Sequence, residues 1–378
     1  MRMLTGFAFV WVAISAALVQ AQSADEVLRA HSKTASSVNK SGYWEEFNNS
    51  FTGSNLNDWN IFSRAGWRAM NKGYYDTAEH EFLAALKAAR KLGLDDPRLL
   101  ARSYADYAWA LQKQGRHAQA EPLAKWALVA REATFEPGTP AVSQSLNQVA
   151  TLYYDLGRYE DAEPLLRRAI DAQSKSSKAN PVEHARSQTL MGLLLAAQRR
   201  YAEAEPYFAR AANLREKAQG PSNPDTADAW NNLAWVYHEQ GKDDQAEPLF
   251  VKALRVFERS RGESDLSVAH VLDGLGQILA RKGKTDEAEA NYLRAIAIWD
   301  QAADQDVSLL QVLRHYADLL EQKGRSADLE KIKARLAPLR SRFTMTQASL
   351  GRWYRFPEPS QMVVPASSGP LNLPRIPG

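Results

Sequence analysis

The sequence of 378 residues contains no cysteine. Disulfide bonds, thiol nucleophiles and cysteine-ligated metal sites are therefore excluded. A lipid-anchored bacterial lipoprotein is excluded as well, because it needs a cysteine directly after its signal sequence. The seven histidines show none of the spacings that are typical of metal ligands. We therefore expect no metal and no other cofactor.

The chain also lacks a strong charge of one sign. Lysine and arginine (47) nearly balance aspartate and glutamate (44), the net charge is +3, and there is no basic block or stripe. Nucleic acids and anionic lipids are therefore not expected as partners. The alternating apolar pattern of β-strands is missing too. Its absence favours an all-α fold.

The sequence contains no complete catalytic motif. Gly276 and the segment Gly283-Lys284-Thr285 resemble the end of a phosphate-binding loop, but the two glycines are seven residues apart where the motif requires five. His238-Glu239 lacks the second histidine of a zinc-protease motif. We therefore predict no catalytic residues and no enzymatic activity.

The sequence does contain a glycine that returns every 42 residues. The glycines of this column are Gly73, Gly115, Gly157, Gly241, Gly283 and, one residue early, Gly324. Arg199 occupies the one position of the series without glycine. A non-glycine residue in a left-handed turn costs about 1 kcal/mol. We predict that Arg199→Gly raises the melting temperature. Self-similarity at a fixed period of this size is typical of a solenoid.

A second column keeps the same period. Six residues after each turn position stands a glutamate: Glu79, Glu121, Glu163, Glu205, Glu247, Glu289 and Glu330. The fixed place beside the turn indicates that these side chains favour the N-terminus of the following helix, where negative charge is stabilised. The column is therefore interpreted as structural, not as a set of acid–base catalysts.

Apolar residues within one unit follow helical spacing twice. Before the turn, Leu146, Val149, Ala150 and Tyr153 fall at i, i+3, i+4 and i+7, and a second apolar stripe follows the turn. The turn glycine supplies the left-handed residue that ends the first helix. The linkers between units carry a helix-capping residue followed by proline, a helix start signal: Asp96-Pro97, Thr139-Pro140, Asn180-Pro181 and Asn223-Pro224. Each unit is thus predicted to be a helix-turn-helix pair.

The repeat resembles the tetratricopeptide repeat, in its longer kinesin-light-chain-like subtype. The resemblance is strongest in Ser145–Glu163 (SLNQVATLYYDLGRYEDAE) and Ala229–Glu247 (AWNNLAWVYHEQGKDDQAE). It implies a right-handed α-solenoid of seven units over residues 59–340. In this family the first helix of each pair lines a concave groove that binds peptides or proteins.

The N-terminal residues 1–21 read as a secretory signal peptide. Arg2 precedes the mostly apolar stretch Leu4–Val19, and small residues permit cleavage after Ala21. An uncleaved membrane anchor is the alternative, although the stretch is shorter than the ~20 residues needed to span a bilayer. We expect a periplasmic or secreted protein that meets a membrane only indirectly or through such an anchor. Residues 22–58 are expected to form a linker with one short helix.

The C-terminal tail, residues 341–378, is aromatic at first and then rich in proline. Its aromatic-basic cluster consists of Arg352, Trp353, Tyr354 and Phe356. This cluster either caps the last helix pair or docks onto a partner. A further alternative is that the tail occupies the protein's own groove.

The family resemblance implies that ligand-facing residues lie 13, 10, 6, 3 and 2 residues before each turn position. The candidates at these places are Trp67, Arg102, Trp109, Asn147, Tyr154, Arg186, Asn231, Trp235, His238, His270 and Arg314. An asparagine amide can both donate to and accept from a peptide backbone. The alternative for the tryptophans is to fill space between helices, and for the asparagines to cap or bridge them. The asparagine of chaperone-binding relatives is absent, because Trp109 and Thr151 stand in its place.

These observations predict an exported scaffold that binds a peptide or protein in its concave groove, within an envelope-associated assembly. Two alternatives stay open. The chain could be a structural subunit of a membrane-bound complex, held through its convex face and tail. It could also be a carbohydrate-binding accessory protein that uses Trp67, Trp109 and Trp235 as stacking platforms.

Overall fold

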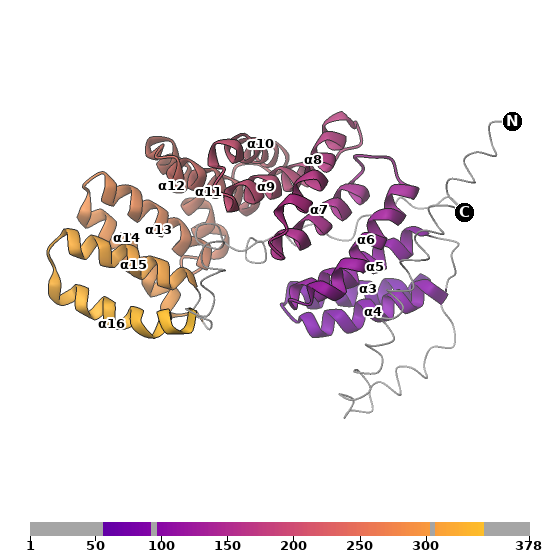
Figure 1. Ribbon diagram of the computed structural model, residues 1–378, viewed down its shortest axis with the longest axis horizontal. Helices are drawn as coiled ribbons and strands as arrows, with labels where there is room; N and C mark the ends of the chain where they lie inside the picture. Colours follow the sequence, from indigo (N-terminus) through magenta and orange to yellow (C-terminus); the bar gives the residue numbers. More distant parts are fainter. Residues whose placement is uncertain (1–55, 92–96, 303–306, 344–378) are drawn as a thin grey trace, which may run out of the picture. The chain divides into compact units, whose positions relative to one another are not determined.

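The computed structural model describes residues 56–91, 97–302 and 307–343. These residues form fourteen α-helices and no strand, which confirms the all-α prediction (Figure 1). The helices are α3 (Leu56–Asn71), α4 (Tyr75–Lys91), α5 (Pro97–Lys113), α6 (His117–Thr134), α7 (Pro140–Asp155), α8 (Tyr159–Lys175), α9 (Pro181–Ala197), α10 (Tyr201–Gln219), α11 (Pro224–Glu239), α12 (Asp243–Arg261), α13 (Leu266–Arg281), α14 (Thr285–Asp300), α15 (Val307–Gln322) and α16 (Ser326–Phe343). They form seven sequential pairs.

The chain divides into two compact units. The described part of unit 1 ends at Ser187, within α9, and that of unit 2 begins at Gln188. Inside each unit, helices that are adjacent in the sequence pack together. The first helices of neighbouring pairs also touch: α5 packs on α3 and α7, and α13 packs on α11 and α15. The first helices thus form one continuous layer within each unit, which we call the first-helix face.

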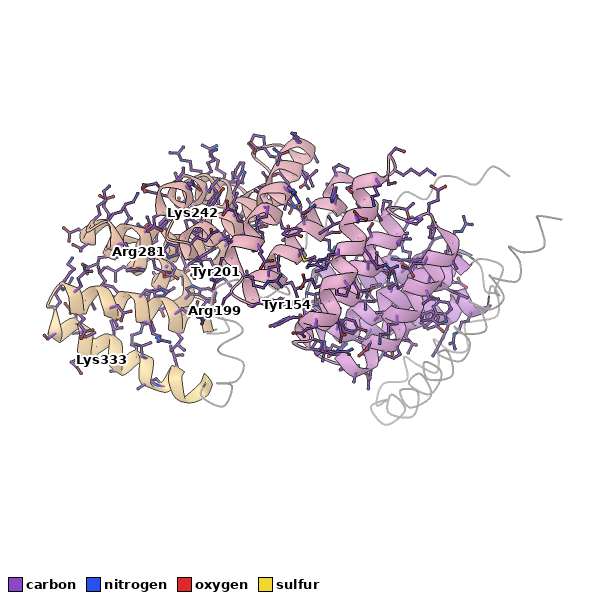
Figure 2. The ribbon with its side chains drawn as sticks, turned by 45° about the horizontal axis from the view of Figure 1, so that its top comes forward. Tyr154, Arg199, Tyr201, Lys242, Arg281 and Lys333 are labelled. Atoms are coloured by element: carbon purple, nitrogen blue, oxygen red, sulfur yellow. The ribbon has the colours of Figure 1, made fainter. Side chains whose placement is uncertain are left out.

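The turns within the pairs share one backbone geometry. Gly73 has a φ of 74°, and the amides of Gly73 and Tyr74 donate to carbonyls in the last turn of α3. Arg199 has a φ of 60°, and the same two hydrogen bonds are made by the amide of Arg199 to the Ala196 carbonyl and by the amide of Arg200 to the Leu195 carbonyl. Figure 2 shows it at the turn between α9 and α10. Arg199 therefore adopts the left-handed conformation that the repeat predicts.

The four predicted helix starts are observed, because α5, α7, α9 and α11 each begin at the predicted proline. The side chains of Asn180 and Asn223 accept hydrogen bonds from backbone amides in the first turns of α9 and α11. Thr139 precedes α7 with proline at the first helical position, but its side chain makes no capping bond. Asp96 lies outside the described residues. These caps satisfy amides that would otherwise have no partner at a helix start.

The core of each unit is built from buried aromatic rings that lie against helical glycines. The Phe250 ring is fully buried and would lie 2.7 Å from a Cβ at Gly274. Tyr292 would lie 2.5 Å from a Cβ at Gly276, a clash that a rigid buried ring cannot relieve. Gly276 is therefore explained by close helix packing, since its Cβ-free surface receives the ring of Tyr292. This agrees with the rejection of the phosphate-loop motif.

The glutamate column has a different role from the one expected. Each glutamate is the fifth residue of its helix or close to it, and the effect of the helix dipole fades beyond the first turn. Five of the seven carboxylates instead bind a cation at the turn of the following pair, whereas Glu163 and Glu330 form ion pairs within their own helices. The pairs are Glu79–Arg116 (2.6 Å), Glu121–Arg158 (3.2 Å), Glu205–Lys242 (2.7 Å), Glu247–Lys282 (2.8 Å) and Glu289–Lys323 (2.7 Å). We call this series the glutamate ladder.

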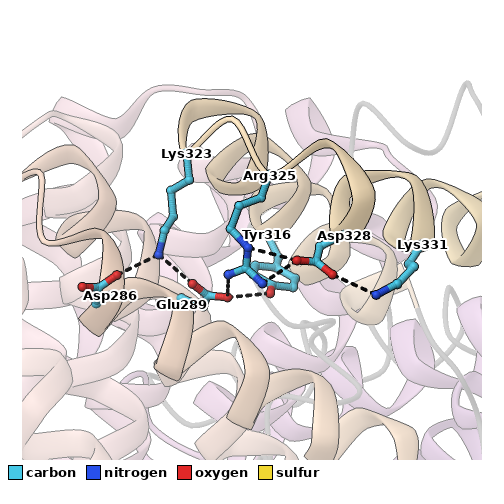
Figure 3. A network of polar contacts seen from close by, with 7 residues as sticks. All are labelled: Asp286, Glu289, Tyr316, Lys323, Arg325, Asp328 and Lys331. Carbon is cyan, nitrogen blue, oxygen red and sulfur yellow. Dashed lines mark hydrogen bonds and ion pairs between the residues drawn. The ribbon is translucent and has the colours of Figure 1, made fainter.

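The last rung of the glutamate ladder is the most connected. Glu289 accepts hydrogen bonds from Lys323, Arg325 and the Tyr316 hydroxyl, as Figure 3 shows. The hydrogen bond from Lys323 is the main cause that holds the pKa of Glu289 below its usual range. Lys323 also binds Asp286. The pair α15–α16 is thus attached to α14 by charge as well as by packing.

The helical array extends slightly beyond the expected boundaries. Helix α3 begins at Leu56 and α16 ends at Phe343, where units over residues 59–340 were expected. Residues 1–21, the rest of the linker before Leu56 and the tail residues Arg352, Trp353, Tyr354 and Phe356 lie outside the described residues. Among the helices that are described, none is both long and apolar enough to cross a membrane.

Candidate functional site

Trp67 lies on α3 and is half-buried. Its indole nitrogen donates to Asp106 of α5 (3.3 Å), and its ring meets Phe82 edge-on with centroids 5.6 Å apart. Burial raises the pKa of Asp106, although the charges of Arg102 and Arg131 oppose this shift. Trp67 therefore joins two first helices and packs on the core.

Arg102, on α5, is occupied within unit 1. Its guanidinium lies 3.6 Å from the carboxylate of Asp106, one helical turn away, and 5.4 Å from the ring centroid of Trp59. Arg131 of α6 is buried nearby and binds the Ala141 carbonyl and the Ser145 hydroxyl. Burial lowers the pKa of Arg131 to about 10. The sequence reasoning missed both Asp106 and Arg131.

Trp109 occupies the same register on α5 as Trp67 on α3, but its surroundings differ. It is half-buried, and two cations lie near its ring: Lys113 at 5.2 Å and Arg186 at 5.6 Å from the centroid. Cations near an indole ring are attracted by the negative charge on its faces. Arg186 comes from α9, so this contact joins the second pair of helices to the fourth. The fold thus places two of the predicted site residues, Trp109 and Arg186, in contact with each other.

Asn147 lies on α7 in unit 1. Its side chain is fully buried, and neither its amide nitrogen nor its amide oxygen has a hydrogen-bond partner. Buried polar groups without partners are rare in folded proteins and call for an explanation. The buried Nε of Arg186 also lacks a partner. Unpaired donors and an unpaired acceptor thus occur on consecutive first helices of unit 1.

Tyr154 lies near the end of α7 and is labelled in Figure 2. It is half-buried, and its ring centroid lies 5.5 Å from that of Tyr159, at the start of α8. The two rings pack across the turn of the third pair. Tyr154 therefore lies at the edge of the first-helix face.

Trp235 and Asn231 of unit 2 are more deeply buried than Trp109 of unit 1. Trp235 on α11 is 7% exposed and meets the rings of Phe250 and His238 edge-on, with centroids 5.3 Å and 5.7 Å apart. Asn231, one turn earlier, is 5% exposed, and its amide oxygen has no partner. Trp235 thus fills space between helices. Asn231 resembles Asn147 in having a buried amide oxygen without a hydrogen-bond partner.

His238 is the centre of a polar cluster between two pairs of unit 2. Its Nδ1 lies 2.9 Å from the carboxylate of Asp243, its Nε2 lies 3.3 Å from the amide oxygen of Gln277, and Arg281 contacts the ring. Burial, together with the charge of Arg281, lowers the pKa of His238. Figure 2 labels Arg281, which comes from α13. The cluster ties α11 to α13.

The cluster continues along the first-helix face. Gln277 donates to Asp273 (3.2 Å), and Asp273 lies 2.8 Å from Nδ1 of His315 on α15. Burial opposes the charge on His315, but Asp273 prevails and raises the pKa of that imidazole. The sequence reasoning missed His315. The sequence feature that could have identified His315 is its place nine residues before the turn position. At the same place in their pairs, Asp106 and Gln148 also form hydrogen bonds to the preceding first helix.

The two remaining candidates belong to unit 2. His270 on α13 is half-buried, with its ring centroid 5.1 Å from that of Trp299. Arg314 on α15 is exposed. Within the described ranges, no group of three or more histidine, aspartate or glutamate side chains is placed to hold a metal ion. The arrangement offers aromatic rings, amides and cations, which suit recognition.

Comparisons with known proteins agree with the repeat. Family models described as tetratricopeptide repeat match residues 101–126, 142–175, 183–259 and 268–305. No curated protein matches the chain. A solved Rap protein complexed with Competence and Sporulation Factor has a TM-score of 0.54 at 16% identity, with 77% of each chain covered.

Two further solved structures are similar. Aspartyl phosphate phosphatase F from Bacillus subtilis has a TM-score of 0.55 at 16% identity, covering 75% of this chain and 70% of that one. A kinesin-light-chain-like protein of Podosopora anserina has a TM-score of 0.47 at 19% identity, covering 54% of this chain and 96% of that one. Such identities show the fold alone. The longer kinesin-light-chain-like subtype therefore stays a prediction.

Proposed function

We propose that this chain, in which four stretches match tetratricopeptide repeat models, is a scaffold without catalytic activity. It binds a peptide or protein partner along its first-helix face. The observation that carries this proposal is the buried amide of Asn147, which has an unpaired donor and an unpaired acceptor. A peptide backbone offers the complementary acceptor and donor.

Other features support the same proposal. Trp109 and Arg186 combine an aromatic ring with a guanidinium, and both residue types dominate the energetics of protein interfaces. The Rap protein of similar fold was solved with a bound factor, which shows for that protein that such a fold can hold a ligand. The formal charges of this chain nearly balance, so recognition rests on local groups, not on a strong overall field.

The proposal includes the location of the protein. The apolar stretch Leu4–Val19 and the small residues before Gln22 support export through a signal peptide. We place the protein in the periplasm or outside the cell, within an envelope-associated assembly. Contact with a membrane would then be indirect, or through an uncleaved signal anchor.

The test is a pull-down from the native envelope fraction. Wild type is compared with Trp109→Ala/Asn231→Ala, which changes the first-helix face in both units. The matched control is Trp126→Ala/Asn291→Ala, which removes the same residue types from the second helices α6 and α14. Circular dichroism checks that both double variants are folded.

We expect wild type and the control variant to capture a partner that the face variant loses. The captured partner would then identify the pathway. If the face variant captures the same partners as wild type, the first-helix face is not the binding surface. Attention would then turn to the second helices and to the tail.

A further inference from the structure

Arg186 differs from the other residues in its register. Thirteen residues before the turn, Arg102 pairs with Asp106 (3.6 Å), and Asp228 pairs with Arg261 (2.7 Å). Arg186 makes no ion pair and no hydrogen bond within the part of the chain that the structure describes. Among the described residues, its guanidinium contacts the ring of Trp109. It is therefore a guanidinium without a carboxylate.

The contact between Arg186 and Trp109 passes over α7. Trp109 stands six residues before the turn position of its pair, and Arg186 stands thirteen residues before the turn position of its own pair. The α7 residues midway between these two registers are Asn147 and Gln148, which stand ten and nine residues before Gly157. Gln148 is occupied, because its amide nitrogen donates to the Ala105 carbonyl (2.7 Å). Asn147 is the buried residue whose amide has no partner. By register, the contact covers Asn147.

The local charge indicates what would displace Arg186. Lys113 and Arg186 both lie within 6 Å of the Trp109 ring centroid, so two positive charges share one indole. A carboxylate pairs with a guanidinium through two parallel hydrogen bonds, which an indole face cannot offer. The attraction of the ring alone is weaker and readily exchanged. An acidic side chain of a ligand is the natural competitor for Arg186.

We propose that Arg186 is a movable cover over Asn147, and that an extended peptide segment bearing an aspartate or glutamate opens it. The peptide carboxylate draws the guanidinium away from Trp109. The peptide backbone then pairs with the uncovered amide of Asn147. This inference rests on the proposed function, and it adds the chemistry of the partner and the movement that admits it.

The experiment uses the full chain and a library of N-acetylated, C-amidated decapeptides with randomised positions. Capping the ends removes the terminal charges, so any acidic preference comes from side chains. Wild type is compared with Arg186→Met, which keeps an apolar chain of similar reach without the charge, and with Asn147→Ala. Arg167→Met, an exposed arginine on α8, is the matched control.

We expect wild type and Arg167→Met to prefer aspartate or glutamate over the corresponding amide at one position by about tenfold, as a charge-assisted hydrogen bond provides. Arg186→Met should lose this preference, to less than about twofold, and bind the neutral peptides at least as tightly as wild type does. Asn147→Ala should weaken all peptides alike.

A second readout follows the cover itself. With 5-fluorotryptophan incorporated, the Trp109 resonance is identified as the one missing from Trp109→Phe. An acidic library peptide should shift this ¹⁹F signal in the direction of its position in Arg186→Met. A signal that does not move on binding would overturn the cover.

The two proposals fail in different ways. If wild type binds peptides but Arg186→Met keeps the acidic preference, or binds neutral peptides more weakly, Arg186 is not a cover and the proposed function stands. If wild type binds no decapeptide at all, both the peptide-binding function and the cover are overturned.

Discussion

Arg199 shows that the turn geometry is imposed by the repeat and not by glycine alone. Its φ of 60° is close to the values of 70–74° at Gly115, Gly157 and Gly241, and the amides of Arg199 and Arg200 make the same two turn hydrogen bonds as a turn glycine and the residue after it. No contact of its side chain compensates, because the Arg199 side chain is exposed and makes no polar contact within the described residues. The packing of α9 and α10 must therefore hold the strained backbone.

We expect Arg199→Gly to raise the melting temperature by about 2–4 °C, since a left-handed arginine costs about 1 kcal/mol. The greater freedom of glycine in the unfolded chain reduces part of this gain. The matched control is Gly241→Arg, at a turn where a Cβ meets nothing within 4 Å. It should lower the melting temperature through backbone strain alone. Calorimetry decides, and a drop for Arg199→Gly would contradict the strain argument.

His315 gives unit 2 a pH dependence of defined sign. An unfolded histidine titrates with a pKa of about 6.5. Asp273 outweighs burial and raises the pKa of folded His315. The charged pair therefore adds stability that is fully present below about pH 6.5 and is lost as the pH rises through the raised pKa.

His315→Gln should thus destabilise the protein at pH 6 and differ less from wild type at pH 9. The expected loss at pH 6 is about 1 kcal/mol, as for a hydrogen bond to a charged group that is partly exposed. Urea unfolding at both pH values measures it. His80→Gln, at an exposed position of unit 1, is the control. If the free energy of unfolding of His315→Gln differs from that of wild type by the same amount at pH 6 and pH 9, the charged pair with Asp273 does not contribute.

Among the helices, the glutamate ladder is the feature that joins one pair to the next. Hydrophobic packing is the larger contribution to solenoid stability, but it has little directional preference. A carboxylate that accepts hydrogen bonds from two or three donors does have such a preference, and it fixes the position of one helix pair relative to the next. Glu289 meets this description, since Lys323, Arg325 and Tyr316 all donate to it.

Glu289→Gln should lower the melting temperature by about 2–4 °C, because the amide cannot bind both cations. The control comes from the same column. Glu330 has no following pair among the described residues, is exposed and binds only Lys333 within its own helix, so Glu330→Gln should change the melting temperature little. Equal effects of the two substitutions would mean that the ladder does not contribute to stability.

The helices were predictable because their signals are local. Period, turn residue and apolar spacing are readable within one unit, so the seven pairs and the left-handed Arg199 could be foreseen. The role of the glutamates could not, because their partners are in the following pair. The sequence does carry a sign of it. A cation stands one residue after the turn position in every pair except the first, where Tyr74 takes its place. Glu79, Glu121 and Glu205 bind this cation, whereas Glu247 binds Lys282, one residue before the turn.

Across the whole molecule, the site was less predictable than the fold. Trp109 and Trp235 share one register, yet Trp109 lies beside Arg186 while Trp235 is buried against Phe250. The difference depends on Phe250 in the same pair as Trp235 and on Arg186 two pairs after Trp109, and the repeat spacing does not specify these side chains. For the same reason the sequence did not predict the polar cluster that runs from His238 through Gln277 and Asp273 to His315.

The export proposal makes a prediction about the mature chain. Expressed from its own sequence in a bacterial host with a periplasm, the protein should be released by osmotic shock and begin at Gln22. The reason is that cleavage after Ala21 removes the apolar stretch. N-terminal sequencing and mass spectrometry of the released protein measure this. An intact Met1 in the membrane fraction would support the uncleaved anchor.

The glutamate ladder also bears on how such a chain can lengthen. A middle pair carries a glutamate for the pair that follows and a cation for the pair that precedes, as Glu121 and Arg116 do in the second pair. A duplicated unit of 42 residues inserted between two existing units would find a compatible charge on both sides. Gene duplication could therefore add whole repeats without any compensating substitution at the new junctions.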